Sequence, residues 1–215
     1  MDIEANLRTY LGQRTPTARY TSFDYCYNHF QLHRERGALS QLVVGPNLQL
    51  SCLHLAFYLA SWGMLRASSV LLQRSVKHYV PVIEVIASSP AAIWDVDAHC
   101  YTEANCGLVL ETAQQVRGAL PDAASDILVT KIMLGVFGCV PAFDTYFKKG
   151  FGTWTFGRAA LMRVAKFYVD NEDMIDRHRV PTLEFDTGTD STRKYTRAKV
   201  IDMVFFVEGG EGPVA

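Results

Sequence analysis

Apolar residues recur at intervals of three and four along most of this chain, which is the spacing of one face of an α-helix. The clearest case follows Thr102, where Cys106, Val109, Ala113 and Val116 fall on one side. Similar spacing predicts further helices over residues 23–36, 48–65, 69–79, 82–87, 126–137, 155–168, 172–178 and 198–208.

Turn residues separate these helices. Segment 182–196 is rich in Thr, Asp and Gly, has no convincing hairpin signal and is predicted to be a loop. The final apolar segment, 198–208, suits strand or helix by composition, and the absence of a partner strand favours helix. We expect an all-α fold, a compact multi-helix globule of roughly ten helices. It would form a single unit over 1–215, with a subdivision into 1–90 and 91–215 as the alternative.

Composition narrows the class of protein. A chain of 215 residues with 49% hydrophobic residues can bury one sizeable core. The net charge of −1 argues against a globally basic nucleic-acid coat, although 11 of the 21 Lys and Arg residues lie between Asp144 and Val200. An odd number of cysteines without CxxC spacing fits a reduced, cytoplasmic setting. Polar residues interrupt the apolar run at 48–65, so we expect a buried helix there, not a membrane span.

Asp144 is the residue whose surroundings favour chemistry. Val140-Pro141 predicts an extended approach, because proline moves its predecessor out of the helical region, and Asp144 then precedes the helix TYFKK. At that position a carboxylate accepts hydrogen bonds from free helix N–H groups and stays ionised. Such a carboxylate stabilises an oxocarbenium-like sugar or activates water against it. The alternative is that Asp144 only caps a helix.

The order of elements around Asp144 resembles the C-terminal half of the helix-hairpin-helix-GPD superfamily of DNA base-excision glycosylases, over residues 125–210. A helix carrying Lys131, DILVTKIMLGVFG, leads through VPAF to Asp144, and TFGRAALMRVAKFY and RAKVIDMVFFVEGG follow. The bacterial alkylated-base glycosylases are the most similar branch. The resemblance implies a glycosylase-like helical arrangement, duplex DNA with a flipped base as partner, and Asp144 as the catalytic aspartate. Lys131 lies near the place of the Schiff-base lysine of bifunctional members.

Two features depart from the family pattern. The phosphate-binding hairpin of the family contains glycines, whereas residues 121–126 here read PDAASD. The cysteines that hold an iron–sulfur cluster in some members have no counterpart, since no cysteine follows Cys139. We therefore expect no cofactor and an unusual DNA anchor, which suggests a specialised substrate such as a modified base of phage DNA.

Basic and aromatic residues supply candidates for holding DNA. The phosphate contacts would come from the helix after Asp144 and from the C-terminal basic segment, namely Lys148, Lys149, Arg193, Lys194, Arg197 and Lys199. A flipped base needs aromatic side chains to stack on, and the candidates are Tyr27, Tyr58, Trp62 and Tyr146. The alternatives without a functional role are a solvent-exposed face for the basic residues and ordinary core packing for the aromatic residues.

Other chemistry has weaker support. Asp95, Asp97, His99 and Cys100 are ligand-type side chains, but alternating positions within one turn rarely converge on a metal without a second, distant cluster. We expect no metal site. The rival to the glycosylase hypothesis is a non-enzymatic helical interaction protein, or a nucleic-acid-binding protein, of a bacterial defence or toxin–antitoxin system.

Overall fold

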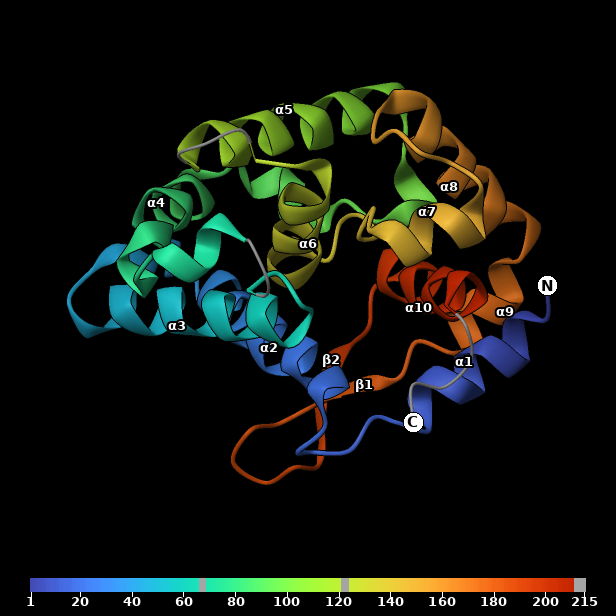
Figure 1. Cartoon of the computed structure of the whole chain (residues 1–215), viewed down its shortest axis with the longest axis horizontal. Helices are drawn as coiled ribbons and strands as arrows, with labels where there is room; N and C mark the ends of the chain where they lie inside the picture. The colour runs from blue at the N-terminus through green and yellow to red at the C-terminus, as the bar shows by residue number, and fades with distance from the viewer. Residues whose placement is uncertain (66–68, 121–123, 211–215) are drawn as a thin grey trace.

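A computed structural model describes residues 1–65, 69–120 and 124–210. Over these ranges the chain is all-α with a single small hairpin, which confirms the predicted fold class and the number of helices (Figure 1). The helices are α1 (Ile3–Leu11), α2 (Ser22–Glu35), α3 (Pro46–Ser61), α4 (Val80–Ser88), α5 (Glu103–Ala119), α6 (Asp126–Phe137), α7 (Thr145–Phe151), α8 (Arg158–Asp170), α9 (Glu172–Arg177) and α10 (Arg197–Gly209). Short 3-10 turns connect them, namely η1 (Arg19–Thr21), η2 (Leu39–Val43), η3 (Val70–Gln73), η4 (Val76–Tyr79), η5 (Ala91–Asp95) and η6 (Ala98–Cys100).

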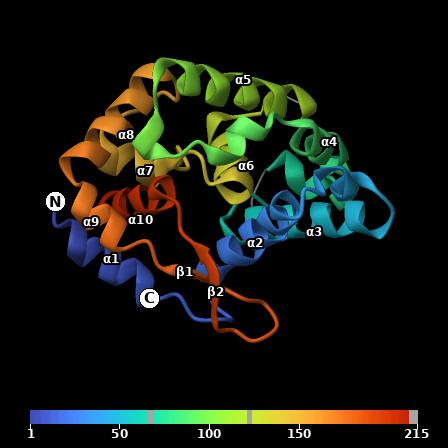
Figure 2. The ribbon, with the colours of Figure 1, turned by 180° about the vertical axis from the view of Figure 1, so that it is seen from behind.

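Helix α6 lies at the centre, with α2, α3 and α5 packed around it (Figure 1). All of its residues from Leu128 to Phe137 are buried, as expected of a helix that is apolar on every side. On one side α2, α3 and α4 pack together, and on the other α10 packs against α7 and α1. The view from behind shows the same separation, with α1 and α10 on the far side of α6 from α3 and α4 (Figure 2). The first and last helices of the described chain are therefore neighbours.

Helix α3 is buried on one face only. Cys52, Leu55 and Leu59 reach the core, whereas Leu53 is 44% and Phe57 69% exposed. The prediction of a buried helix over 48–65 is therefore only partly right, and the helix ends at Ser61. In the described part of the chain, no helix is both long and apolar enough to cross a bilayer.

The helix predicted over 69–79 is replaced by η3 and η4, and α4 starts at Val80 with Pro81 in its first turn. A proline in the first turn costs no hydrogen bond, because its missing N–H would have had no helical partner there. The helix predicted over 82–87 is therefore present and begins slightly earlier, at Val80. Ser68, where the earlier of these two segments was expected to begin, lies outside the described residues.

Segment 182–196 was predicted to be a loop, and that prediction is right only for residues 184–189 and 195–196. Strands β1 (Pro181–Leu183) and β2 (Asp190–Lys194) form an antiparallel pair in which Leu183 faces Asp190. Their position is fixed by α2, because Asn28 Nδ2 donates to the Leu183 carbonyl at 3.0 Å and the Leu183 N–H donates to Asp24 at 2.8 Å. No short turn motif marks this hairpin in the sequence; buried polar side chains more than 150 positions away hold it.

Candidate functional site

The loop from Gly138 to Asp144 is held by side chains from three other segments of the chain. Gly138 ends α6 at φ +69°, a left-handed conformation that favours glycine. The Cys139 carbonyl accepts a hydrogen bond from the Tyr101 hydroxyl at 2.6 Å. The N–H of Ala142 donates to Asp202 Oδ1 at 2.9 Å, and that of Phe143 donates to Thr130 Oγ1 at 2.9 Å. Because these buried backbone groups are satisfied, the loop presents Asp144 in one position.

Asp144 caps α7, as predicted, and it also forms an ion pair. Its Oδ1 accepts from the Phe147 N–H at 3.0 Å, and Lys131 Nζ on α6 donates to its Oδ2 at 2.8 Å. The side chains of Lys131 and Asp144 are only 5% and 12% exposed. The structure thus brings together the two residues that the sequence assigned to catalysis. Lys131 lies within α6, and Asp144 lies at the start of α7.

A second buried ion pair lies behind the first. Lys199 Nζ on α10 donates to Asp202 Oδ2 at 3.0 Å and to the Tyr10 hydroxyl at 2.8 Å. Burial raises the pKa of Asp202, and the negative charge of Asp144 adds to that rise while Lys199 and Lys131 oppose it. The two pairs therefore interact electrostatically, and Asp202 also positions the loop before Asp144 through Ala142.

Asp144 and Lys131 line a cleft of about 910 Å³. Its aromatic lining comes from five segments of the chain and consists of Tyr10, Tyr20, Trp62, Tyr146 and Phe206. The rings touch in sequence: Trp62 lies 5.4 Å from both Tyr20 and Phe206, and Phe206 lies 5.3 Å from Tyr146. We call this set the aromatic floor. Its edge-to-face contacts are the favourable geometry for aromatic pairs.

Three cations approach the indole of Trp62. Lys131 Nζ and Lys199 Nζ each lie 5.4 Å from its ring centre, and the Arg19 guanidinium lies 5.6 Å away. Within the described residues the buried Trp62 Nε1 has no hydrogen-bond acceptor. A cleft that combines an aromatic floor, a carboxylate and several cations can take a flat, electron-rich group and stabilise charge beside it.

Two of the four predicted base-pocket residues lie on this cleft, namely Trp62 and Tyr146. Tyr58 does not, because its ring is buried against α6 where a Cβ at Gly135 would meet it at 2.4 Å. Tyr27 also lies in the core, stacked on Phe23 at 5.3 Å. For Tyr27 and Tyr58 the core-packing alternative is therefore correct.

Tyr10, Tyr20 and Arg19 of the N-terminal region were not predicted as site residues. Tyr10 reaches the cleft because α1 packs on α10, a contact between segments almost 200 positions apart. Arg19 and Tyr20 lie in η1, and the ring of Tyr20 is 6.4 Å from that of Phe206 on α10. The sequence carries no local signal for that contact, since aromatic residues at helical spacing are most often simple core.

The predicted DNA contacts of the C-terminal segment are mostly occupied by internal partners. Lys199 is 1% exposed, so its assignment to a DNA backbone is wrong. Arg193 pairs with Glu35 at 2.7 Å, and Arg197 pairs with Asp176 at 2.7 Å. Lys194 is exposed on β2. The segment is basic in sequence but largely neutralised in the fold.

The two lysines of α7 differ from each other. Lys149 is exposed and lines the cleft, whereas Lys148 is half-buried and is not among the cleft residues. No ion pair with a carboxylate engages either of them in the described ranges. Of the proposed anchor at 121–126, residues 121–123 lie outside the described residues, and Asp126 pairs with Arg117 at 2.7 Å.

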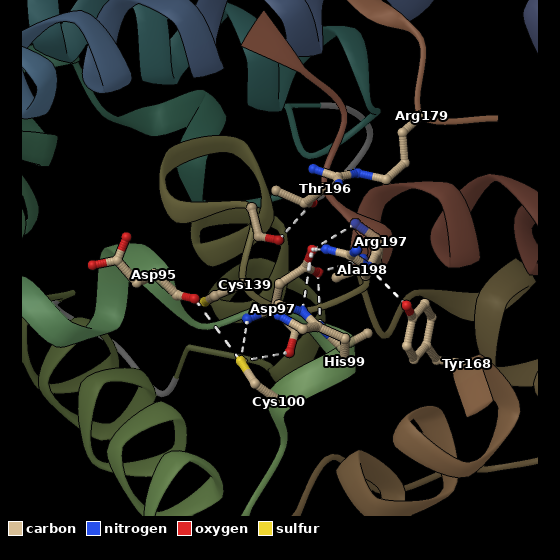
Figure 3. Close-up of polar contacts among 12 residues, drawn as sticks. Asp95, Asp97, His99, Cys100, Cys139, Tyr168, Arg179, Thr196, Arg197 and Ala198 are labelled. Carbon is tan, nitrogen blue, oxygen red and sulfur yellow. Dashed lines mark hydrogen bonds and ion pairs between the residues drawn. The ribbon is translucent and has the colours of Figure 1, made fainter. Parts of the chain in front are cut away.

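The ligand-type residues around Asp97 form a structural junction (Figure 3). Asp97 Oδ1 accepts from the N–H groups of Ala98 and Ala198, and its Oδ2 accepts from that of Arg197 at 2.8 Å. Burial raises the pKa of Asp97, and these backbone donors oppose the rise. Residues 1–65, 69–120 and 124–210 contain no group of three or more His, Cys, Asp or Glu side chains placed to hold a metal ion.

The chain matches no protein-family model, no curated protein and no solved structure. The resemblance to helix-hairpin-helix glycosylases therefore remains a prediction.

Proposed function

We propose that this protein is a DNA base-excision glycosylase-like enzyme that cleaves the N-glycosidic bond of a damaged or modified base. The observation that carries the proposal is the Lys131–Asp144 ion pair at 2.8 Å on the wall of a cleft lined by aromatic rings. In this proposal duplex DNA is the partner, the target base is flipped into the cleft and stacks on the aromatic floor, and the DNA sugar comes to lie beside Asp144.

Asp144 would act on the sugar as a carboxylate. A carboxylate has about four lone-pair sites, and protein donors use one on each oxygen here. As the bond between C1′ and the base nitrogen breaks, its electron pair leaves with the base and C1′ becomes positively charged. Asp144 stabilises that charge, water then bonds to C1′, and the proton that water loses is taken up by the carboxylate or solvent. The departing base gains one proton, which completes the hydrolysis.

Lys131 would hold Oδ2 of Asp144 and orient the carboxylate. The five cysteines, all within the described residues, are free thiols. Free thiols are compatible with a reducing, cytoplasmic location, which is part of the proposal.

The test is base release. Purified protein is incubated with duplexes that carry single damaged or modified bases, and alkali then cleaves any abasic site. We expect at least one substrate to be cleaved, and we expect Asp144→Asn to lower the rate by at least about a hundredfold, because a charged group at the reacting sugar is lost. Lys77→Gln, which changes an exposed charge on η4 away from the residues that line the cleft, is the matched control and should retain activity. The proposal fails if no substrate yields abasic sites, or if Asp144→Asn cleaves at the wild-type rate.

A helical interaction protein of a bacterial defence system is the second candidate, and the outer face of α3 favours it. Leu50, Leu53 and Phe57 are exposed there at helical spacing. Sedimentation analysis can separate the two candidates. Self-association that Phe57→Lys abolishes, together with no base release from any duplex, would support this second function over the first.

A further inference from the structure

The cleft carries more positive than negative charge. Its charged lining in the described residues consists of Arg19, Lys131, Lys149 and Asp144. Asp144 is already engaged by Lys131. Arg19 and Lys149 have no carboxylate partner within the described residues, so the cleft holds two uncompensated cations.

Arg19 is placed to bind an anion beside the aromatic floor. Its side chain is exposed, and its guanidinium lies 5.2 Å from the ring centre of Tyr20 and 5.6 Å from that of Trp62. A guanidinium held near aromatic rings keeps N–H donors free at its edges, and these donors match two oxygens of a phosphate. No described residue accepts a hydrogen bond from the guanidinium of Arg19.

Lys149 supplies the second cation from α7, the helix that Asp144 caps. It is exposed and lines the cleft together with Tyr146, one turn earlier on the same helix. Its neighbour Lys148 does not line the cleft, which makes the two lysines a matched pair on one helix. Lysine binds phosphate as a mobile point charge, so Lys149 complements the directional donors of Arg19.

We infer that Arg19 and Lys149 form a phosphate subsite at the cleft, which binds the phosphate of a nucleotide whose base lies on the aromatic floor. The inference rests on the proposed function for the identity of the group on the floor. A volume of about 910 Å³ accommodates a ligand of nucleotide size. The phosphate could come from a free nucleotide or from a nucleic-acid backbone, and the experiment includes an arm for each source.

Calorimetric titration tests the subsite with four probes: thymidine 5′-monophosphate, thymidine, inorganic phosphate and a short single-stranded oligothymidylate. We expect the wild-type protein to bind the monophosphate about tenfold or more tightly than thymidine, since charge-assisted hydrogen bonds to phosphate are made only by the former. The double variant Arg19→Gln/Lys149→Gln should lose this difference and bind thymidine with unchanged affinity. Lys148→Gln should behave as wild type. Because both altered side chains are exposed, the double variant is expected to fold.

The oligothymidylate identifies the source. Tighter binding of the oligomer than of the monophosphate, with a salt dependence that the double variant reduces, assigns the subsite to a nucleic-acid backbone. Binding of the monophosphate alone assigns it to a free nucleotide. The inference is overturned if wild type binds thymidine and its monophosphate equally, if neither binds, or if the double variant keeps the difference.

Failure of the phosphate subsite can be distinguished from failure of the proposed function. Phosphate discrimination by Arg19 and Lys149 without base release from any duplex would leave the subsite standing and remove the glycosylase function. If the double variant releases the base at the wild-type rate, the glycosylase function is retained and the subsite is rejected.

Discussion

Two aspartates in this molecule begin helices from similarly buried positions, yet they face different surroundings. With backbone and side chain counted together, Asp97 is 6% exposed and Asp144 is 8% exposed. Asp97 accepts three backbone N–H groups and joins residues 97–98 to the start of α10 (Figure 3). Asp144 accepts one backbone N–H and one ammonium, and it lines the aromatic cleft. Burial alone does not distinguish a structural carboxylate from a candidate catalytic one; the use of its acceptor sites does.

The largest effect is expected at Asp97. Asp97→Ala removes the acceptor of three buried N–H groups, each of which costs roughly 1–3 kcal/mol when unsatisfied, so the free energy of unfolding should fall by about 3 kcal/mol or more. Urea unfolding at neutral pH measures this change. Asp97→Asn retains one side-chain oxygen as acceptor and should lose less. A loss under about 1 kcal/mol for Asp97→Ala would show that the hydrogen bonds of Asp97 do not stabilise the start of α10.

At Asp144, the contribution of the ion pair to the free energy of unfolding can be separated from that of the helix cap. Asp144→Ala leaves the Lys131 ammonium buried without its partner, and the expected loss is about 3 kcal/mol. Adding Lys131→Met removes the uncompensated charge. The double variant should then lose only the cap, about 1 kcal/mol. A double-mutant cycle by urea unfolding gives the coupling. If the two single losses simply add, the ion pair does not contribute as the geometry indicates.

The smallest effect is expected under acid conditions and comes from a half-buried histidine. Burial lowers the pKa of His29 on α2 from 6.5 to about 3, and His54 and His33 add to that lowering. The His29 ring stacks on that of His54 at 4.3 Å, and its Nε2 lies 3.0 Å from Ser51 Oγ.

The unfolded chain therefore takes up a proton at His29 near pH 6.5, whereas the folded chain does not until about pH 3. Stability contributed by neutral His29 is present above pH 6.5 and should decline as the pH falls toward 3. Thermal unfolding between these limits measures the slope. His29→Gln should flatten it, and His178→Gln at the end of α9 should not. An unchanged slope in His29→Gln would contradict the assignment.

The two aspartates also differ in how much of their role could be predicted from the sequence. Asp144 was predictable as a cap because the signal is local: a proline three positions earlier, then a polar residue before an apolar helix. Lys131 was predictable as its companion only through a resemblance. The role of Asp97 was not predictable, because its partners Arg197 and Ala198 lie about 100 positions later, and no local spacing records such a contact.

The same limit applies to larger elements. Helices α5, α6 and α10 follow from periodicity or local apolarity and caps, which are properties of neighbouring residues. The hairpin β1–β2 and the N-terminal half of the cleft do not, because they depend on packing between distant segments. The base-pocket prediction failed for Tyr27 and Tyr58 for this reason: their sequence context is the same whether a ring faces the core or the cleft.

The contact between α1 and α10 has a consequence for the order in which the molecule is made. Asn6 on α1 donates to the Val204 carbonyl and to Glu208 on α10, so the first helix of the described chain docks on the last. Because the ribosome synthesises α1 before α10, Tyr10 cannot contact Lys199, and Tyr20 cannot contact Phe206, until α10 has emerged. The cleft is thus completed only after α10 has been synthesised, and a nascent chain that stops before α10 cannot form the complete site.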